Sequence, residues 1–228
     1  MRAAIYFTPP AEDPLTRRAA EWLGRCAFSN QATRGREPVL DAMVAEPARY
    51  GFHATMKAPF RLADGTDLDA LTADFEGFCE TTPASRIGTL ALVRLGRFLA
   101  LTPSDPQPGP QALAERAVRH FEAYRAPLSD VERARRRPET LTARQNRYLE
   151  EWGYPYVFEE FRFHMTLTGP LNPGSLDDLE ERLAARFAPF LGHTLAIDGL
   201  ALFIQTAADR PFVVHAYQTL QQAEIPAS

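Results

Sequence analysis

Two short segments of this sequence each place a threonine two residues after a histidine. His53 precedes Thr55, and His164 precedes Thr166. In a β-strand, residues two apart project from the same face, so each pair is expected to point in one direction. Two facing imidazoles can cleave a phosphodiester: the neutral one takes a proton from the attacking water or hydroxyl, and the charged one protonates the leaving oxygen. The threonine hydroxyls can hold the non-bridging phosphate oxygens.

The two segments align without a gap. The sequences GFHATMKAPF at 51–60 and RFHMTLTGPL at 162–171 match at phenylalanine, histidine, threonine and proline. Copied core packing explains the phenylalanines and prolines, but it does not require a histidine and a threonine on the polar face of both strands. The match therefore predicts an internal duplication, with the two polar faces meeting across a cleft. Thr168 extends the polar face of the second copy and is a further candidate for binding phosphate.

Lys57 extends the polar face of the first copy by the same alternation. It is the one lysine among 25 basic residues, the others being arginine. A compact ammonium near a bound phosphate offsets the charge that builds there, so Lys57 is predicted to bind the phosphate. The alternative is chance, because the second copy has Thr168 at the equivalent position.

The other possible roles of histidine fit this sequence less well. A zinc site usually draws three or four ligands from His, Cys and carboxylates, and no carboxylate shares a face with His53 or His164, so no metal is expected. His120, His193 and His215 have no comparable polar partners and are interpreted as structural. The sequence also has no Gly-rich phosphate loop, no Walker-type Gly-Lys-Ser and no Gly-x-Ser-x-Gly elbow.

The elements that must position these residues follow the same duplication. Strict alternation predicts strands over 52–58 and 161–169. An amphipathic helix and two strands follow each of them, so the first copy spans about 50–102 and the second about 161–217. The whole of 1–228 is predicted to be one domain with two pseudo-symmetric lobes. Helices are predicted over 15–26, 67–79, 111–124 and 176–190, and only a loose stretch over 27–46.

The segment between the copies, about 126–160, is rich in arginine and tyrosine. Arginine forks bind phosphate oxygens, and tyrosine rings stack on a base or a sugar. Arg144 and Tyr148 lie one helical turn apart and are predicted to form a lid over the cleft. The alternative is a solvated helix whose arginines pair with neighbouring glutamates.

Composition excludes several classes of protein. The chain has 228 residues, of which 45% are hydrophobic and 24% charged, the balance of a globular domain. No apolar run approaches the roughly 18 residues of a membrane span, and the start of the chain is predicted to form a strand rather than a signal peptide. Two cysteines are too few for a disulfide scaffold, so a cytoplasmic location is expected. A net charge of −4 argues against a broadly basic nucleic-acid binder.

The sequences of three segments resemble those of a known family. YGFHATMKAPF at 50–60, WGYPY at 152–156 and FRFHMTLT at 161–168 resemble the two-histidine (2H) phosphoesterase superfamily, in particular a bacterial branch encoded beside phosphonate-utilisation genes. That superfamily includes the RNA ligase/cyclic phosphodiesterase proteins of the LigT type. The resemblance covers nearly the whole chain. It implies a bilobal α+β fold with two antiparallel sheets flanking a central cleft, helices outside, and metal-independent chemistry without a cofactor.

The superfamily motif carries over to His53 and Thr55, and to His164 and Thr166. The resemblance implies a phosphodiesterase that acts on a small cyclic phosphodiester, with a ribose cyclic phosphate suggested by the phosphonate link. RNA ends bearing a 2′,3′-cyclic phosphate are the other candidate substrate. The rival interpretation is a module that binds a nucleotide or a phosphorylated sugar without turnover. Two proton-transfer groups favour catalysis, because binding a phosphate requires neither of them.

Overall fold

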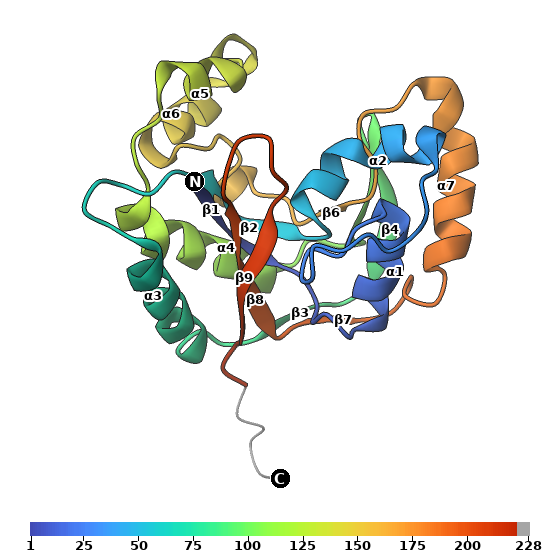
Figure 1. The fold of residues 1–228 in the computed structure, drawn as a ribbon, viewed down its shortest axis with the longest axis horizontal. Coiled ribbons are helices and arrows are strands. Elements are labelled where there is room, and N and C mark those ends of the chain that lie inside the picture. The colour runs from blue at the N-terminus through green and yellow to red at the C-terminus, as the bar shows by residue number, and fades with distance from the viewer. Residues whose placement is uncertain (223–228) are drawn as a thin grey trace.

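Antiparallel sheets with helices packed against them make up the fold, in a computed structural model that describes residues 1–222 (Figure 1). This confirms the predicted α+β class. The strands are β1 (Arg2–Phe7), β2 (Ala54–Phe60), β3 (Ser85–Ile87), β4 (Leu90–Leu95), β5 (Phe98–Pro103), β6 (Met165–Thr166), β7 (Leu195–Ile197), β8 (Gly199–Gln205) and β9 (Val213–Thr219). The α-helices are α1 (Pro14–Leu23), α2 (Pro38–Tyr50), α3 (Leu68–Glu80), α4 (Pro108–His120), α5 (Asp130–Arg135), α6 (Ala143–Trp152) and α7 (Pro173–Phe187). The 3₁₀ turns are η1 (Phe121–Tyr124), η2 (Pro138–Thr140) and η3 (Phe158–Glu160).

Two main sheets divide the strands between them. The first has the order β2-β1-β8-β9 and the second the order β4-β5-β6. The short strands β3 and β7 pair with each other, antiparallel. α3 and α4 pack on the first sheet, and α7 packs on the second, beside α1 (Figure 1). Each sheet therefore has one face covered by helices, which leaves its other face to border a site.

The order of elements in the first half of the chain recurs in the second half, over a longer stretch than the two predicted copies. If the extra helices before each motif strand are left out (α2 in the first half, α5 and α6 in the second), the series β1-α1-β2-α3-β3-β4 recurs as β5-α4-β6-α7-β7-β8. Under this correspondence the order β2-β1-β8 in one sheet matches β6-β5-β4 in the other. β4 and β8 are thus exchanged: each half of the chain contributes its last strand to the sheet of the other half. The pairing of β3 with its own counterpart β7 lies where a two-fold axis would pass.

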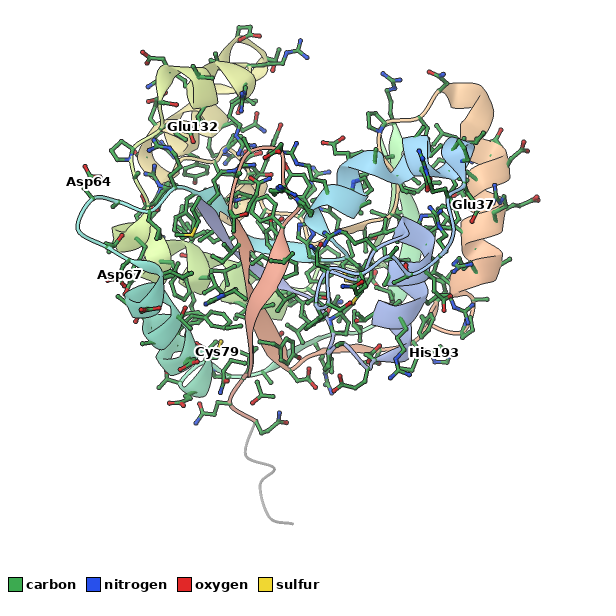
Figure 2. The ribbon with its side chains drawn as sticks, viewed as in Figure 1. Glu37, Asp64, Asp67, Cys79, Glu132 and His193 are labelled. Carbon is green, nitrogen blue, oxygen red and sulfur yellow. The ribbon has the colours of Figure 1, made fainter. Side chains whose placement is uncertain are left out.

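Local signals explain most element boundaries. The Asp67 carboxylate accepts a hydrogen bond from the Ala70 amide, 2.8 Å away, and so caps the start of α3. Figure 2 labels Asp67 at that end of the helix and Cys79 near the other, where Cys79 is fully buried in the core as predicted. α1 ends at Gly24, whose φ of 80° is the left-handed conformation that favours glycine at a helix end.

α2 lies partly in a stretch for which the sequence predicted no element. Its first residue is Pro38, which suits the first turn because the missing amide hydrogen would have no partner there. Leu40 and Val44, four residues apart, bury one side of the helix. Pro47 lies inside it and conceals the pattern, because proline usually ends a helix. Within the described residues no helix is long and apolar enough to cross a membrane.

Candidate active site

His53 lies at the entrance of β2, where α2 gives way to the strand. Its Nδ1 is 2.8 Å from the carbonyl oxygen of Gly51. A carbonyl can only accept, so Nδ1 carries the proton, and in the neutral ring Nε2 is an acceptor. The Thr55 hydroxyl lies 3.3 Å from that Nε2 and donates to it. The tautomer of His53 is therefore fixed by the backbone.

Gly51 makes this geometry possible. Its φ is 82°, a conformation that residues with a Cβ rarely adopt. A Cβ at this position would also come within 2.5 Å of the Ala27 Cβ. The first motif therefore depends on a glycine in front of Phe52 and His53, which the matching of the two copies alone does not reveal.

His164 repeats the arrangement in the second sheet. Its Nδ1 is 2.7 Å from the carbonyl oxygen of Arg162, which again lies two residues earlier. The backbone thus fixes the same tautomer in both copies, with the proton on Nδ1 and with Nε2 as the acceptor of the neutral ring. The neighbouring Phe52 and Phe163 are buried in the core, as the alternation predicts, while the two histidines are partly exposed.

The two histidines line one cavity of about 250 Å³ between the sheets. Thr55, Thr166 and Thr168 line the same cavity. The site residues predicted from the two motifs are therefore brought together, apart from Lys57. Thr168 is fully buried, and its hydroxyl oxygen accepts a hydrogen bond of 3.0 Å from the Leu99 amide of the neighbouring β5. β6 is short, and beyond its end the Thr168 hydroxyl oxygen takes the place of a backbone carbonyl as the acceptor for β5. The hydroxyl hydrogen of Thr168 can still be donated to a bound phosphate.

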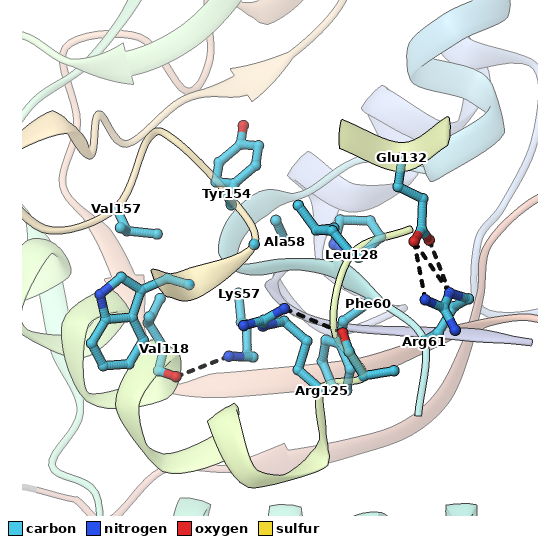
Figure 3. A pocket seen from close by; sticks show the side chains of 14 residues that line it. Lys57, Ala58, Phe60, Arg61, Val118, Arg125, Leu128, Glu132, Tyr154 and Val157 are labelled. Carbon is cyan, nitrogen blue, oxygen red and sulfur yellow. Dashed lines mark hydrogen bonds and ion pairs between the residues drawn. The ribbon is translucent and has the colours of Figure 1, made fainter. Parts of the chain in front are cut away.

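Lys57 does not reach this cavity. β1 advances one residue from Ile5 to Tyr6, while β2 advances two between their partners, Lys57 and Thr55. This β-bulge interrupts the alternation, so Lys57 points to the opposite side from Thr55. Its Nζ donates to the Val118 carbonyl at 2.9 Å (Figure 3). The same Nζ pairs with a Glu122 carboxylate oxygen at 2.8 Å. The lysine anchors β2 to α4 and η1 rather than facing the histidines.

The residues predicted as a lid are also elsewhere. Arg144 pairs with Glu160 at 2.8 Å and does not line the cavity. Tyr148 packs against Phe158 in a small core, and its hydroxyl is hydrogen-bonded to Glu159. Arg144 and Tyr148 do lie one helical turn apart on α6, but their face of the helix meets η3 instead of the cavity.

The inserted segment instead contributes Arg136 and Tyr154 to the cavity wall. The Arg136 guanidinium lies 4.9 Å from the centre of the Tyr154 ring. Arg136 is partly buried, while its neighbours Arg135 and Arg137 are exposed. The sequence does not distinguish Arg136 from the arginines around it. Arg136 follows the last residue of α5, so the helical spacing of that element does not predict which way its side chain points. The inserted segment lies between α4 and β6. In the first half of the chain, α2 lies between α1 and β2 in the same way, and it too lines the cavity.

Further residues that the sequence did not single out complete the wall. Tyr6 of β1 stacks on the His53 ring, with ring centres 3.7 Å apart and an interplanar angle of 20°. Arg2, Glu46 and Tyr50 line the same cavity. Strand parity in β1 puts Arg2 and Tyr6 on one face, but only the pairing of β1 with β2 brings that face to His53.

Burial decides the protonation of the two histidines. Loss of solvent lowers the pKa of His53 to about 4, with the charge of His164 adding to the effect and the Gly51 hydrogen bond opposing it. Burial also lowers the pKa of His164, against the hydrogen bond to the Arg162 carbonyl. The stacked Tyr6 ring makes His53 the more strongly desolvated of the two.

The cavity continues into a second recess of about 530 Å³ on the far side of His164. Thr55, Phe98, Tyr154 and His164 line both spaces. Phe161 and Tyr156 add aromatic surface to the recess. Among the described residues, no group of three or more His, Cys, Asp or Glu side chains is placed to hold a metal ion.

A family model matches residues 55–213, a range that includes the second motif and all of the inserted segment. Its description is "Protein of unknown function (DUF1045)". The chain belongs to this family.

Two relatives of this DUF1045 chain are named "Ribose 1,5-bisphosphate phosphokinase PhnN". The protein from Janthinobacterium sp. (strain Marseille) is 37% identical over 225 residues, which cover 93% of this chain and 49% of the relative. The protein from Laribacter hongkongensis (strain HLHK9) is 36% identical over 215 residues, covering 93% of this chain and 50% of the relative. The DUF1045 chain thus spans about half the length of these relatives. Their PhnN names fit the phosphonate-associated branch that the sequence resembles.

Two solved structures similar to the DUF1045 chain share little sequence identity with it. "Crystal structure of E.coli LigT complexed with NADP+" is 13% identical, covers 97% of this chain and 98% of its own, and has a TM-score of 0.46. "Crystal structure of phosphoesterase" is 14% identical, covers 97% and 99%, and has a TM-score of 0.43. LigT, after which the resembled type of protein is called, is thus among the structures to which this chain is similar.

Proposed function

We propose that this chain is a metal-independent phosphodiesterase that opens a small cyclic phosphodiester by two-histidine acid–base catalysis. One observation carries the proposal: both histidines give Nδ1 to a carbonyl two residues earlier and line the same cavity. Two imidazoles with the same fixed tautomer are what proton transfer on both sides of one phosphorus requires. A module that only binds phosphate gains nothing from fixing both rings.

The proposed steps use only groups of this chain and water. One histidine takes a proton from water through Nε2 while the water oxygen bonds to phosphorus. The bond from phosphorus to one ester oxygen breaks, and the other histidine, protonated at Nε2, gives its proton to that oxygen. When water takes the place of the Thr55 hydroxyl at His53 Nε2, that hydroxyl turns to the phosphate. It then donates to a non-bridging oxygen, as the Thr166 hydroxyl does, while negative charge builds there. The product is a phosphomonoester beside a free hydroxyl.

The geometry supports His53 as the base and His164 as the acid. His53 stacks on Tyr6 at 3.7 Å, in a setting that disfavours the charged ring. The pKa of His53 is lowered to about 4, so this ring is neutral at pH values well above 4. His164 has no such stacking partner, since the nearest ring, Phe98, is 6.1 Å away and tilted.

A ribose derivative is the substrate that the relatives support. Both are named for a phosphokinase of ribose 1,5-bisphosphate, and the matched half covers this chain nearly end to end. A ribose cyclic phosphate fits a cavity of about 250 Å³ lined by hydroxyls and guanidinium groups. The second recess has room for a base, so an RNA end with a 2′,3′-cyclic phosphate is the other substrate to test.

Kinase activity is a second candidate function, favoured by the names of the relatives. The sequence of this chain has no Gly-rich phosphate loop and no Gly-Lys-Ser, the usual means of holding ATP phosphates. We assign the kinase activity to the half of the relatives that this chain does not match.

One assay separates these candidates. The purified protein is given ribose 1,2-cyclic phosphate, a nucleoside 2′,3′-cyclic phosphate and an RNA with a cyclic phosphate end, with and without EDTA. Ring opening that EDTA does not change supports the proposal. ATP-dependent phosphorylation of ribose 1,5-bisphosphate, without opening of any cyclic phosphate, would support the kinase instead.

A further inference from the structure

Two guanidinium groups in the cavity have no carboxylate partner within the part of the chain that the structure describes. Arg136 makes no ion pair there and lies over the Tyr154 ring at 4.9 Å. Arg2 is held by a neutral group, its Nε donating to the Gln205 side-chain oxygen at 2.8 Å. Most other arginines of the inserted segment behave differently: Arg133, Arg137 and Arg144 each pair with a glutamate.

The balance of charge in the cavity is therefore positive. Arg2 and Arg136 face one carboxylate, Glu46, which forms no ion pair among the described residues. Both guanidiniums lie close enough to Tyr6 to lower its pKa, against the larger effect of burial. Since Tyr6 stacks on His53, the two charges lie on the side of the cavity that the first histidine borders.

The scissile phosphate does not need these arginines. A cyclic phosphodiester carries a single negative charge, and its two non-bridging oxygens are matched by the threonine hydroxyls and the charged histidine. An arginine side chain binds a phosphomonoester more tightly than a serine or threonine hydroxyl does, because two N–H donors of its guanidinium meet two phosphate oxygens. A second anionic group on the substrate would satisfy them.

We propose that Arg136, with Arg2, binds a phosphomonoester of the substrate that is separate from the cyclic phosphate. This inference rests on the proposed function and narrows it to sugars or nucleosides that carry a cyclic phosphodiester and a second phosphate. Hydrolysis of such a compound yields a bisphosphate.

The fold holds Arg136 in place through the far end of β2. The Arg61 guanidinium pairs with Glu132 of α5 at 3.1 Å (Figure 3). It also donates to the Pro127 carbonyl at 2.7 Å. The Arg61 pairing, together with the Ser129 hydrogen bonds, outweighs burial and lowers the pKa of Glu132 to about 2. α5 is thereby tied to the strand that carries Thr55, and the residue after α5 is Arg136. These contacts anchor the start of the inserted segment to the strand of the first motif.

The test compares two substrates that differ by one group: a nucleoside 2′,3′-cyclic phosphate with and without a 5′-phosphate. The readout is the ratio of their kcat/KM values. Wild type is expected to prefer the phosphorylated compound, and Arg136→Ala is expected to reduce the ratio roughly ten- to hundredfold, the range of a hydrogen-bonded charge pair. Arg136→Lys should restore part of it. The matched control is Arg135→Ala, which removes the exposed arginine immediately before Arg136 and should leave the ratio unchanged.

The outcomes separate this inference from the function it rests on. A wild-type ratio near one, or an unchanged ratio in Arg136→Ala, overturns the second phosphate site while leaving the phosphodiesterase intact. If wild type opens neither compound, the proposed function fails. The site is then tested by calorimetry with ribose 5-phosphate against ribose: binding that requires both the phosphate and Arg136 supports it, and equal binding of the two sugars overturns it.

Discussion

Replacing Lys57 with methionine tests the role that the structure gives to this lysine. The Lys57 side chain is 4% exposed, and its ammonium binds the Val118 carbonyl and Glu122. Breaking a buried ion pair typically costs about 3–5 kcal/mol. Glu122 is 25% exposed and keeps Arg125, whose Nε lies 2.9 Å from its other oxygen, so less is lost here. An unpaired Val118 carbonyl alone costs about 1–3 kcal/mol, and we expect a total near 2–3 kcal/mol.

Chemical denaturation of wild type and Lys57→Met measures this loss, and a thermal melt should fall by roughly 4–12 °C. kcat/KM should change far less than in the histidine variants, because the ammonium does not touch the cavity. Arg133→Met is the control: its ion pair with Glu150 is about half exposed and worth about 0–1 kcal/mol. Unchanged stability in Lys57→Met together with a large fall in kcat/KM would refute the reasoning, since the ammonium would then act on the substrate.

Three further predictions concern the site itself. His53→Ala and His164→Ala should each lower kcat roughly 10²–10⁴-fold without unfolding the protein, as circular dichroism can check; full activity in either variant would rule out the mechanism. The profile of kcat/KM against pH should be bell-shaped, with its optimum at acidic pH. On the acid side, kcat/KM should rise around pH 4 as His53 loses its proton; on the alkaline side, it should fall as His164 loses its own, because the pKa of His164 is lowered from the ordinary 6.5. An optimum above pH 7 would contradict the assignment. Gly51→Ala should lose about 1–3 kcal/mol of stability, because its φ of 82° with ψ of 170° is a conformation essentially limited to glycine. The contact with Ala27 should add to this loss, and kcat should fall as well. A variant as stable and active as wild type would show that the Gly51 carbonyl does not set the His53 ring.

The motif pairs were predictable because they depend on local spacing. Strand parity put His53 with Thr55 and His164 with Thr166, and both pairs line the cavity. Lys57 is the case where parity failed, because a bulge at the pairing of β1 with β2 is a property of two strands together. A single sequence contains no signal for it.

The wall of the cavity was harder to predict than its motifs. Arg136 follows the end of a short helix, and its place depends on how that helix docks on β2 through Glu132. Arg144 and Tyr148 were identified by helical spacing, which tells which residues share a face but not what the face meets. Tyr6 reaches His53 only through the sheet. Contacts between distant segments decide all of these positions.

The exchange of β4 and β8 also bears on how the protein is made. The first half leaves the ribosome with β1 and β2 as a two-stranded ribbon, which is marginal without a third strand. The third strand is β8, close to 200 residues after β1, and it pairs Arg2 with Gln205. The β4–β5 hairpin can form early, because its strands are adjacent in sequence. It completes neither half of the chain, since β4 ends the first half and β5 starts the second. The two histidines therefore meet only after both halves have been synthesised, and a chain cut at the turn near Gly96 gives two fragments that each lack a strand they need. Because pairings so distant in sequence close slowly, the catalytic cavity is among the last features of the molecule to form.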